Sequence, residues 1–454
     1  MIYLLKKYFP FLILVLFLVI KLSTLHVRAS DTSIYFYTAK ELLSGKILYK
    51  DVFFTNFPLV PYIASFYYLI SHGNLLFYFS TAFFESSFTA LIIYKIIIKS
   101  SPRIYAIQGV IIFLFSFIIL ATSQHQTGVF LVCLSTVLSY LFFQEKKYIS
   151  SGVFTAFALL SKAYSLPLLI SYLCILLIKE REGMIKFICG FLSCIAIILL
   201  PSLLLAYNDL LKDVFFYSLT RSQGISKLHI FWFAIKHDPL IFLLMFANIF
   251  WIKKRLFFGL FSLFSLLFFL FYKDSYYLYL VVMIPILILS FPEIVKDLLA
   301  RFSINKNLIT TIIGVAAIVN IMIFFSGYHS LQNIDIESMT KTINKENPKV
   351  LYGVNGITPA LALATNKPLL NEIVDTNSNI FRKGYLNADH LTKDLMRNHG
   401  FFITEGVSYP ELGISQEIYT DIVTTKDIKN NCTLIKKFPF RSEGISNTIN
   451  FFQC

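Results

Sequence analysis

The sequence predicts an α-helical protein that crosses a membrane several times. Of its 454 residues, 56% are hydrophobic and only 15% are charged, which leaves too little polar surface for a soluble globule. The apolar residues gather in about eleven runs, most of them near the ~20 residues that cross a bilayer core. The runs cover roughly residues 8–25, 75–94, 104–122, 127–143, 149–161, 164–178, 186–206, 239–252, 256–272, 276–294 and 308–326.

The distribution of positive charge predicts the orientation. The net charge is +14, but Lys and Arg recur in short clusters between apolar runs and form no single basic face, so we expect no nucleic-acid partner. These clusters fall in alternate loops, which the positive-inside rule assigns to the cytoplasm together with the N-terminus. Arg28 stands where a cleavage site needs a small residue, so we expect an uncleaved first span. The protein should therefore be a multi-pass plasma (inner) membrane protein.

The chain after residue 330 is a different kind of sequence. Residues 331–454 are polar, and "KVLYGVNG", "ITPALALATNKPLL" and "GFFITEGV" read as strand, helix and strand. We expect a membrane domain over 1–330 and a small extracytoplasmic α/β domain over 331–454. Cys432 and Cys454 can pair if this tail is outside the cell.

The first outer loop, residues 26–74, is neither a span nor an ordinary loop. "DTSIYFYTAKELLSG" has Ser30 or Asp31 as an N-cap candidate and Gly45 as a stop, which predicts a helix lying in the membrane interface. "FPLVPYIASFYYLIS" is apolar for only about fifteen residues and predicts a second interfacial helix that is too short to span.

These motifs carry a resemblance. An acid outside the first span (Asp31), then "ELLSG", "YKD" and "NFPL", is similar to the first external loop of the GT-C class of membrane glycosyltransferases. The similar branch, which is family 39-like, contains lipid A aminoarabinose transferase and protein O-mannosyltransferases. "YISSGVFTAFALLSKAYSLPLLI" and "KDSYYLYLVVMIPIL" resemble two further spans of that class. The resemblance covers about residues 1–330, with a soluble tail typical of the family after it.

The resemblance implies an inverting transfer of a sugar from a polyprenyl-phosphate donor to an acceptor outside the membrane. The acceptor would be a glycan, a lipid or a protein, attacking through a hydroxyl or an amine. Asp31 would be the general base that removes the acceptor's proton, worth typically ~10²- to 10⁴-fold in rate. Without the resemblance, Asp31 reads more simply as a helix cap.

Three basic residues are candidates for the donor phosphate. Lys162 at the outer end of a span would pair with the phosphate, and a snorkelling Lys is the alternative. Arg221 and Lys227 lie in the 207–238 loop among aromatic residues, where Arg offers a planar fork matched to phosphate oxygens. Interfacial anchoring is the alternative for Lys227.

Further polar residues on the outer side complete the predicted site. Tyr49 and Asp51 would shape the acceptor side, with a solvated loop as the alternative for Asp51. Asp274 and Tyr276 would contact the donor sugar or be structural.

The second outer loop departs from the family pattern. Many relatives carry a second acid after the first, where this chain has Thr32, and often another acid in the second outer loop. There "TSQHQTG" offers only His125, a candidate for phosphate or acceptor, between neutral Gln124 and Gln126. A tightly held divalent metal has little support with so few carboxylates, and we name no metal ligand or other cofactor.

Glu85 is an ionisable residue inside the run 75–94. Such a group is costly in a membrane, so we expect it to face the bundle and to hydrogen-bond with Ser86, Ser87 or a buried base. We interpret it as a packing residue.

Two other function classes stay open. A lipid-linked glycan flippase or other transporter needs a polar path, yet apart from Glu85 the spans contain almost no ionisable groups. An O-antigen polymerase or ligase usually places its key Arg and His in a large loop of the second half, whereas the 207–238 loop is modest.

Overall fold

The computed structural model describes residues 2–220, 224–302, 305–328, 334–376, 380–381, 384, 386–406, 431–442 and 445–454. The chain divides into two compact units. The first contains residues 1–25, 80–198 and 226–326, and the second contains residues 26–79, 199–225 and 327–454.

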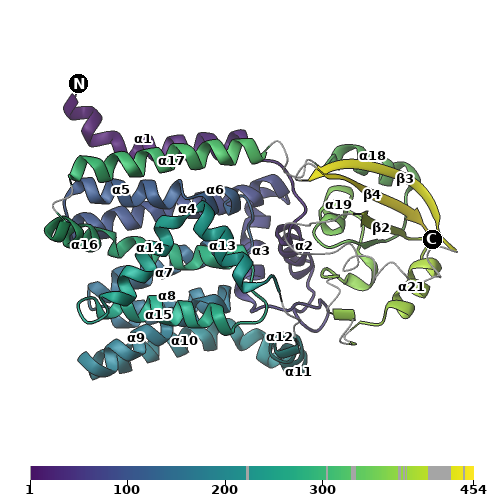
Figure 1. Ribbon diagram of the computed structural model, residues 1–454. Helices are drawn as coiled ribbons and strands as arrows, with labels where there is room; N and C mark the ends of the chain where they lie inside the picture. The colour runs from purple at the N-terminus through teal and green to yellow at the C-terminus, as the bar shows by residue number, and fades with distance from the viewer. Residues whose placement is uncertain are drawn as a thin grey trace. The chain divides into compact units, whose positions relative to one another are not determined.

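The first unit is a bundle of helices (Figure 1). Its helices are α1 (Ile2–Ser23), most of α4 (Leu75–Ser100), α5 (Arg103–Leu114), α6 (Phe117–Thr122), α7 (Val129–Gln144), α8 (Tyr148–Ser161), η1 (Ala163–Ser165), α9 (Leu166–Lys179), most of α10 (Arg181–Leu205), α13 (Lys227–His237), α14 (Pro239–Phe250), α15 (Leu256–Phe271), η3 (Tyr277–Met283), α16 (Ile284–Phe302) and most of α17 (Lys306–Tyr328). Glycine lets α8 and α10 approach closely: a Cβ on Gly152 would lie 2.1 Å from the Phe187 carbonyl oxygen.

Within the described residues, four helices are long and apolar enough to cross a membrane: Leu75–Ser100, Arg181–Leu205, Tyr277–Phe302 and Lys306–Gly327. The pair α13 and α14 qualifies as a fifth span, bent by 108°. Six shorter apolar helices account for the other six predicted runs, and a seventh, Leu59–Ser71, is one of the two helices predicted for the first outer loop. A multi-pass membrane protein is therefore confirmed, and the number of eleven spans stays a prediction.

The predicted span 104–122 is wrong as a single helix, because it breaks into α5 and α6. The hydroxyl of Ser116 accepts a hydrogen bond from the Ile119 amide and caps α6. The carboxylate of Asp238 accepts two more, from the Phe117 and Ile118 amides at 2.8 and 2.7 Å. These acceptors satisfy the amides that the break leaves without helical partners. The predicted 207–238 loop is also corrected, because its residues Lys227–His237 form the helix α13.

The second unit combines the first outer loop with the C-terminal residues. It contains α2 (Asp31–Leu43), α3 (Leu59–Ser71), α11 (Tyr207–Leu210), the π-helix η2 (Leu211–Phe216), α12 (Tyr217–Thr220), α18 (Ile336–Glu346), α19 (Ile357–Thr365), η4 (Leu370–Glu372) and α21 (Ala388–Arg397). The two predicted helices of the outer loop are confirmed as α2 and α3. Their limits follow the expected signals, since α2 starts after Ser30 and Gly45 follows its end with φ +95°.

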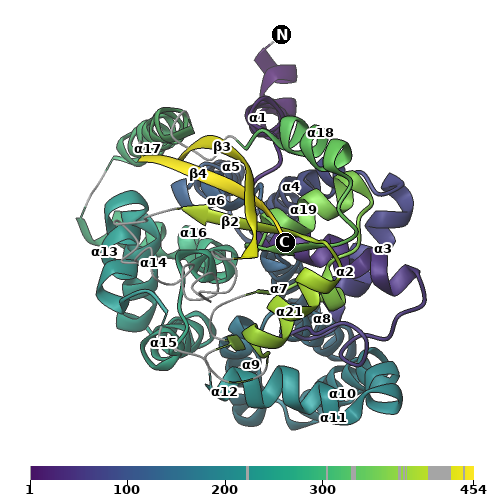
Figure 2. The ribbon, with the colours of Figure 1, turned by 90° about the vertical axis from the view of Figure 1, so that its right-hand side faces the viewer.

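A four-stranded sheet forms the core of the C-terminal part. Its order is β1-β2-β4-β3, with β1 (Leu351–Gly353) parallel to β2 (Phe401–Gly406) and β4 (Ile445–Gln453) antiparallel to both β2 and β3 (Thr433–Ser442). The predicted strand, helix and strand are confirmed as β1, α19 and β2, and Cys432 and Cys454 form a disulfide. One hydrophobic cluster joins the sheet and α19 to the outer loop through Ile34, Tyr37 and Val52. In both ribbon views α19 lies beside α2 (Figures 1 and 2).

Candidate active site

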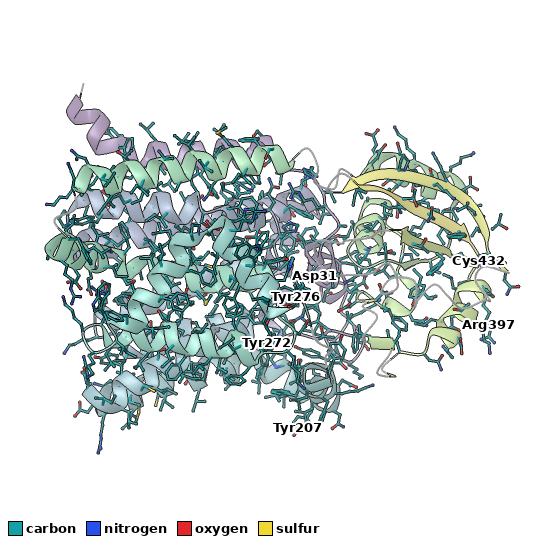
Figure 3. All side chains as sticks on the ribbon, in the orientation of Figure 1. Asp31, Tyr207, Tyr272, Tyr276, Arg397 and Cys432 are labelled. Carbon is teal, nitrogen blue, oxygen red and sulfur yellow. A yellow bond between two sulfur atoms is a disulfide. The ribbon has the colours of Figure 1, made fainter. Side chains whose placement is uncertain are left out.

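Asp31 is the first residue of α2, and its side chain is exposed. The capping role belongs to Ser30, which has extended φ and ψ and whose hydroxyl accepts a hydrogen bond from the Thr32 amide. Asp31 lies on the side of its unit away from Cys432 and Arg397 (Figure 3). An exposed carboxylate at a helix start whose cap is another residue fits the predicted general base.

Tyr49 and Asp51 shape the turn that follows α2. The Asp51 carboxylate accepts a hydrogen bond from the Ile47 amide at 2.8 Å, which closes the turn. Tyr49 has φ +72°, and its buried hydroxyl donates to the Asn56 carbonyl oxygen at 2.8 Å. Burial raises the pKa of Tyr49 well above its usual value, so it stays a neutral donor. Both residues act first on the loop itself, and a role toward the acceptor stays a prediction.

Asp213 is a buried carboxyl that the sequence reading missed. It lies in η2, is only 3% exposed, and accepts a hydrogen bond from the Phe54 amide of the first outer loop. Burial raises the pKa of Asp213 to about 7, although the Phe54 amide and nearby Lys212 oppose the shift. The sequence signal was an acid in "LLKDVFF", where the flanking residues are apolar.

In the first unit, Lys162 terminates α8 in an extended conformation and is 8% exposed. Its carbonyl oxygen accepts a hydrogen bond from the Ser165 hydroxyl at 3.1 Å, which holds the chain where η1 begins. Such burial differs from a lysine that snorkels into water, and the role of Lys162 toward the donor phosphate stays a prediction.

Two glutamines fasten the second outer loop on either side of His125. The Gln124 side-chain amide donates to Thr24, the residue after α1, and the Gln126 side-chain amide donates to Thr81 and Glu85 of α4. His125 is half-buried between them. The neutral glutamines are therefore structural anchors of this turn.

Glu85 is buried as expected, and Gln126 is a partner that was not predicted. The Ser86 and Ser87 hydroxyls donate to carbonyl oxygens one turn earlier in α4, those of Ala82 and Phe83. Glu85 instead accepts from Gln126 at 2.8 Å. An acid thus lies beside the second outer loop after all, supplied by the neighbouring helix.

A second buried cation escaped the sequence reading. Lys21 near the end of α1 is 0% exposed, and its Nζ donates to the Leu120 carbonyl oxygen at 2.6 Å and lies 4.6 Å from the Phe324 ring centroid. It holds α1 to the end of α6 and to α17. Its sequence signal was a single Lys near the outer end of an apolar run.

Three predicted site residues come together at the turn between α15 and η3. Lys227 starts α13, and its Nζ donates to the Tyr272 carbonyl oxygen and the Ser275 hydroxyl. Asp274 attracts the same ammonium group, and Tyr276 is the residue before η3, with its ring 5.6 Å from that of Tyr279. Tyr272 and Tyr276, labelled in Figure 3, are the first and last residues of this turn. Arg221 lies outside the described residues.

Metal binding has no visible set of ligands in the part of the chain that the structure describes. No three His, Cys, Asp or Glu side chains gather there as a metal site would require. The sequence prediction about metals stays a prediction.

The arrangement of helices and sheet is similar to that of a solved integral-membrane glycosyltransferase of the GT-C class. The likeness is to ArnT from Cupriavidus metallidurans, an aminoarabinose transferase. Its apo crystal structure matches with a TM-score of 0.62 and 12% identity over 98% of each chain. The crystal structure of the same protein bound to undecaprenyl phosphate matches with a TM-score of 0.57 and 11% identity over 97% of each chain. No protein-family model and no curated protein matches this chain. At this identity the likeness establishes the fold.

Proposed function

We propose that this protein is an inverting glycosyltransferase that moves a sugar from a polyprenyl-phosphate donor to an acceptor hydroxyl or amine. The observation that carries the proposal is the likeness to ArnT over 98% of both chains, C-terminal part included. A likeness limited to the helical bundle would leave out α2 and the turn after it, which carry Asp31, Tyr49 and Asp51. The bound undecaprenyl phosphate of the second ArnT structure supports a polyprenyl phosphate as the donor carrier.

Asp31 is the proposed general base. Its carboxylate takes the proton of the acceptor hydroxyl or amine as that group attacks the anomeric carbon. The bond from the anomeric carbon to the phosphate oxygen breaks in the same step, and its electron pair leaves with the polyprenyl phosphate. Because one displacement forms the product, the configuration at the anomeric carbon inverts.

Lys162, Arg221 and Lys227 are the proposed cationic ligands of the departing phosphate. A cation aimed at the phosphate stabilises the charge that develops on the leaving group. Asp274 and Tyr276, next to Lys227, are proposed to contact the donor sugar. Tyr49, Asp51 and His125 are proposed to line the acceptor side.

The reaction is proposed to take place on the extracytoplasmic face, where residues 331–454 would form a domain beside the membrane domain of residues 1–330. The basic clusters support a cytoplasmic N-terminus. The Cys432–Cys454 disulfide supports an oxidising compartment for the C-terminal domain.

Sugar transfer in proteoliposomes tests the proposal, with a mixed pool of polyprenyl-phosphate sugars as donors. Wild type should consume one donor, and Asp31→Asn should still bind that donor but lose at least about 10²-fold in turnover. Asp389→Asn is the matched control, because Asp389 is an exposed acid in the first turn of α21, where Asn387 is the cap.

Three outcomes of this experiment have distinct meanings. Loss in Asp31→Asn alone supports the general base. Equal turnover in wild type and Asp31→Asn would remove Asp31 from the mechanism. Movement of the lipid-linked sugar across the bilayer with no transfer by wild type would favour a flippase and reject the proposed function.

A further inference from the structure

The start of α2 touches the start of a helix from the C-terminal part of the same unit. Gly356 is the N-cap residue of α19, with φ +77°. A Cβ on Gly356 would lie 2.7 Å from the backbone nitrogen and 3.0 Å from the carbonyl oxygen of Ser30. The position therefore excludes any side chain, both by conformation and by the closeness of Ser30.

A hydrogen bond fixes the same contact from the other side. The Ser33 hydroxyl donates to the Gly356 carbonyl oxygen at 2.5 Å, and Ser33 is fully buried. Ser30 and Ser33 enclose Asp31 in the sequence, so the two contacts hold the backbone just before and just after the proposed base.

The residues around this contact are buried and hydrogen-bonded. Ile34 and Tyr37 of α2 share a hydrophobic cluster with Ile357 and Leu361 of α19, all at most 3% exposed. The Tyr37 hydroxyl accepts from the Leu369 amide at 3.0 Å and donates to Glu372 at 3.1 Å. The helix that carries Asp31 is thus packed along its length against residues 357–372.

The electrostatics of the contact favour a negative charge at Asp31. A helix N-terminus carries a positive partial charge, which stabilises a nearby anion by ~0.3–1 kcal/mol at an exposed position. Asp31 lies in the first turn of α2, and the start of α19 meets α2 at the adjoining Ser30. The N-termini of α2 and α19 therefore meet at the backbone of Ser30, the residue before the proposed base.

We propose that the 353–358 turn of the C-terminal domain positions the Asp31 carboxylate for catalysis. The turn acts through the Ser30 backbone and the Ser33 hydroxyl, so its residues are positioning residues that need not touch the substrate. This inference rests on the proposed function and assigns the C-terminal domain a part in the chemical step, besides any role in selecting the acceptor.

Gly356→Ala tests the inference against Gly384→Ala. Gly384 has nearly the same backbone conformation, φ +74°, but nothing lies within 4 Å of its added Cβ. Both variants therefore strain the backbone, and only Gly356→Ala displaces Ser30. We expect kcat to fall about 10²-fold in Gly356→Ala with donor KM unchanged, because an error of about 1 Å in a reacting group has that effect. Gly384→Ala should keep the wild-type kcat.

A second pair of variants, with smaller structural changes, keeps the test decisive if Gly356→Ala does not fold. Ser33→Ala removes the bond to Gly356 together with a local bond to the Ser30 carbonyl oxygen. Ser44→Ala removes only a local bond of the same kind, from the other end of α2 to the Glu41 carbonyl oxygen, and so controls for the local part. Ser33→Ala should lower kcat by about tenfold and Ser44→Ala should not. Equal effects within either pair would overturn the inference.

The Asp31→Glu background separates positioning from general damage. Its longer side chain already places the carboxylate elsewhere, so Ser33→Ala should cost less than about twofold further there. The same loss in both backgrounds would mean that Ser33 does not act through Asp31, and the inference would fail while the proposed function stood. Wild-type turnover by Asp31→Asn would instead reject the base assignment itself.

Discussion

The first outer loop is held at two places by different kinds of contact. The helix that begins at Asp31 packs against residues 357–361 through Ile34 and Tyr37, and hydrogen bonds to residues 356–372 add directional contacts, such as Ser33 with Gly356 and Tyr37 with Glu372. The 47–57 turn is held by apolar and aromatic packing against residues 206–217, and buried Asp213 accepts a hydrogen bond from its Phe54 amide. Hydrogen bonds fix direction, whereas apolar packing tolerates small shifts. The carboxylate that needs a defined direction is at the polar contact.

The largest expected effect is on the packed turn. Phe54 is 2% exposed and clusters with Tyr35 and Tyr49 against Leu210 and Val214. Phe54→Ala should destabilise the second unit by about 3–5 kcal/mol, because it removes a buried ring and leaves a cavity. Thermal unfolding in detergent, with hydrogen exchange over residues 47–57, measures the loss. Phe66→Ala, on α3 and 59% exposed, is the control and should change little.

The next effect sharpens the polar side of the comparison. Tyr37→Phe removes a hydroxyl that serves both the Leu369 amide and Glu372, and it leaves that buried amide without an acceptor. We expect a loss of about 1–3 kcal/mol in the same unfolding measurement. Tyr352→Phe is the control, since the Tyr352 ring stacks on Phe402 and its hydroxyl has no hydrogen-bond partner among the described residues. Equal losses would mean that the ring and not the hydroxyl holds α2.

A pH dependence should distinguish the turn from the helix start. The pKa of Asp213 is raised to about 7 in the folded state, above the ~3.9 of an unfolded chain, so the folded state binds the extra proton between these values. The stability due to neutral Asp213 is full below about pH 4 and is lost as the pH rises through about 7. Protection of the Phe54 amide from hydrogen exchange, corrected for the intrinsic rate, should fall over this window.

Asp213→Asn supplies the control for that titration. Its side-chain oxygen can still accept from the Phe54 amide, but the residue cannot ionise, so protection should become flat with pH. A slope unchanged by Asp213→Asn would assign the titration to another group.

The smallest effect is expected at the exposed edge of the polar contact. The Lys40 ammonium group donates to the Asn366 side chain at 2.9 Å in an exposed position. Lys40→Ala should change stability by no more than about 0.5 kcal/mol, because water replaces an exposed hydrogen bond. A loss comparable with that of Tyr37→Phe would show that the whole polar surface, and not its buried part, fixes α2.

Local signals in the sequence predicted the parts of the fold that depend on local structure. Ser30 and Gly45 gave the limits of α2, and apolar run length gave most helices of the bundle. The break between α5 and α6 could not be predicted, because the acceptor that stabilises it is Asp238, about 120 residues away. The partner of Glu85 was missed for the same reason, since Gln126 meets it only in the folded bundle.

The candidate site was predictable where a motif carried it. The resemblance pointed to Asp31, which is an exposed acid at the N-terminal end of α2. The sequence also predicted Lys227, Asp274 and Tyr276 as site residues, and these lie at the turn between α15 and η3. Asp213 carried no motif, because its unusual pKa arises from tertiary burial. The 353–358 turn looked like an ordinary link between a strand and a helix, and its meeting with Ser30 is a contact across more than 320 residues.

The two hydrogen bonds from the Phe117 and Ile118 amides to Asp238 have a consequence for the order in which the protein is synthesised and folds. The Phe117 and Ile118 amides lie at the break in the apolar run 104–122, and a buried amide without an acceptor costs about 1–3 kcal/mol. A ribosome adding ~5–20 residues per second needs on the order of 6–24 s to pass from this break to Asp238. Until then the break between α5 and α6 lacks the carboxylate acceptor that it has in the folded protein. The break is therefore completed only after a residue from the second half of the bundle has been made.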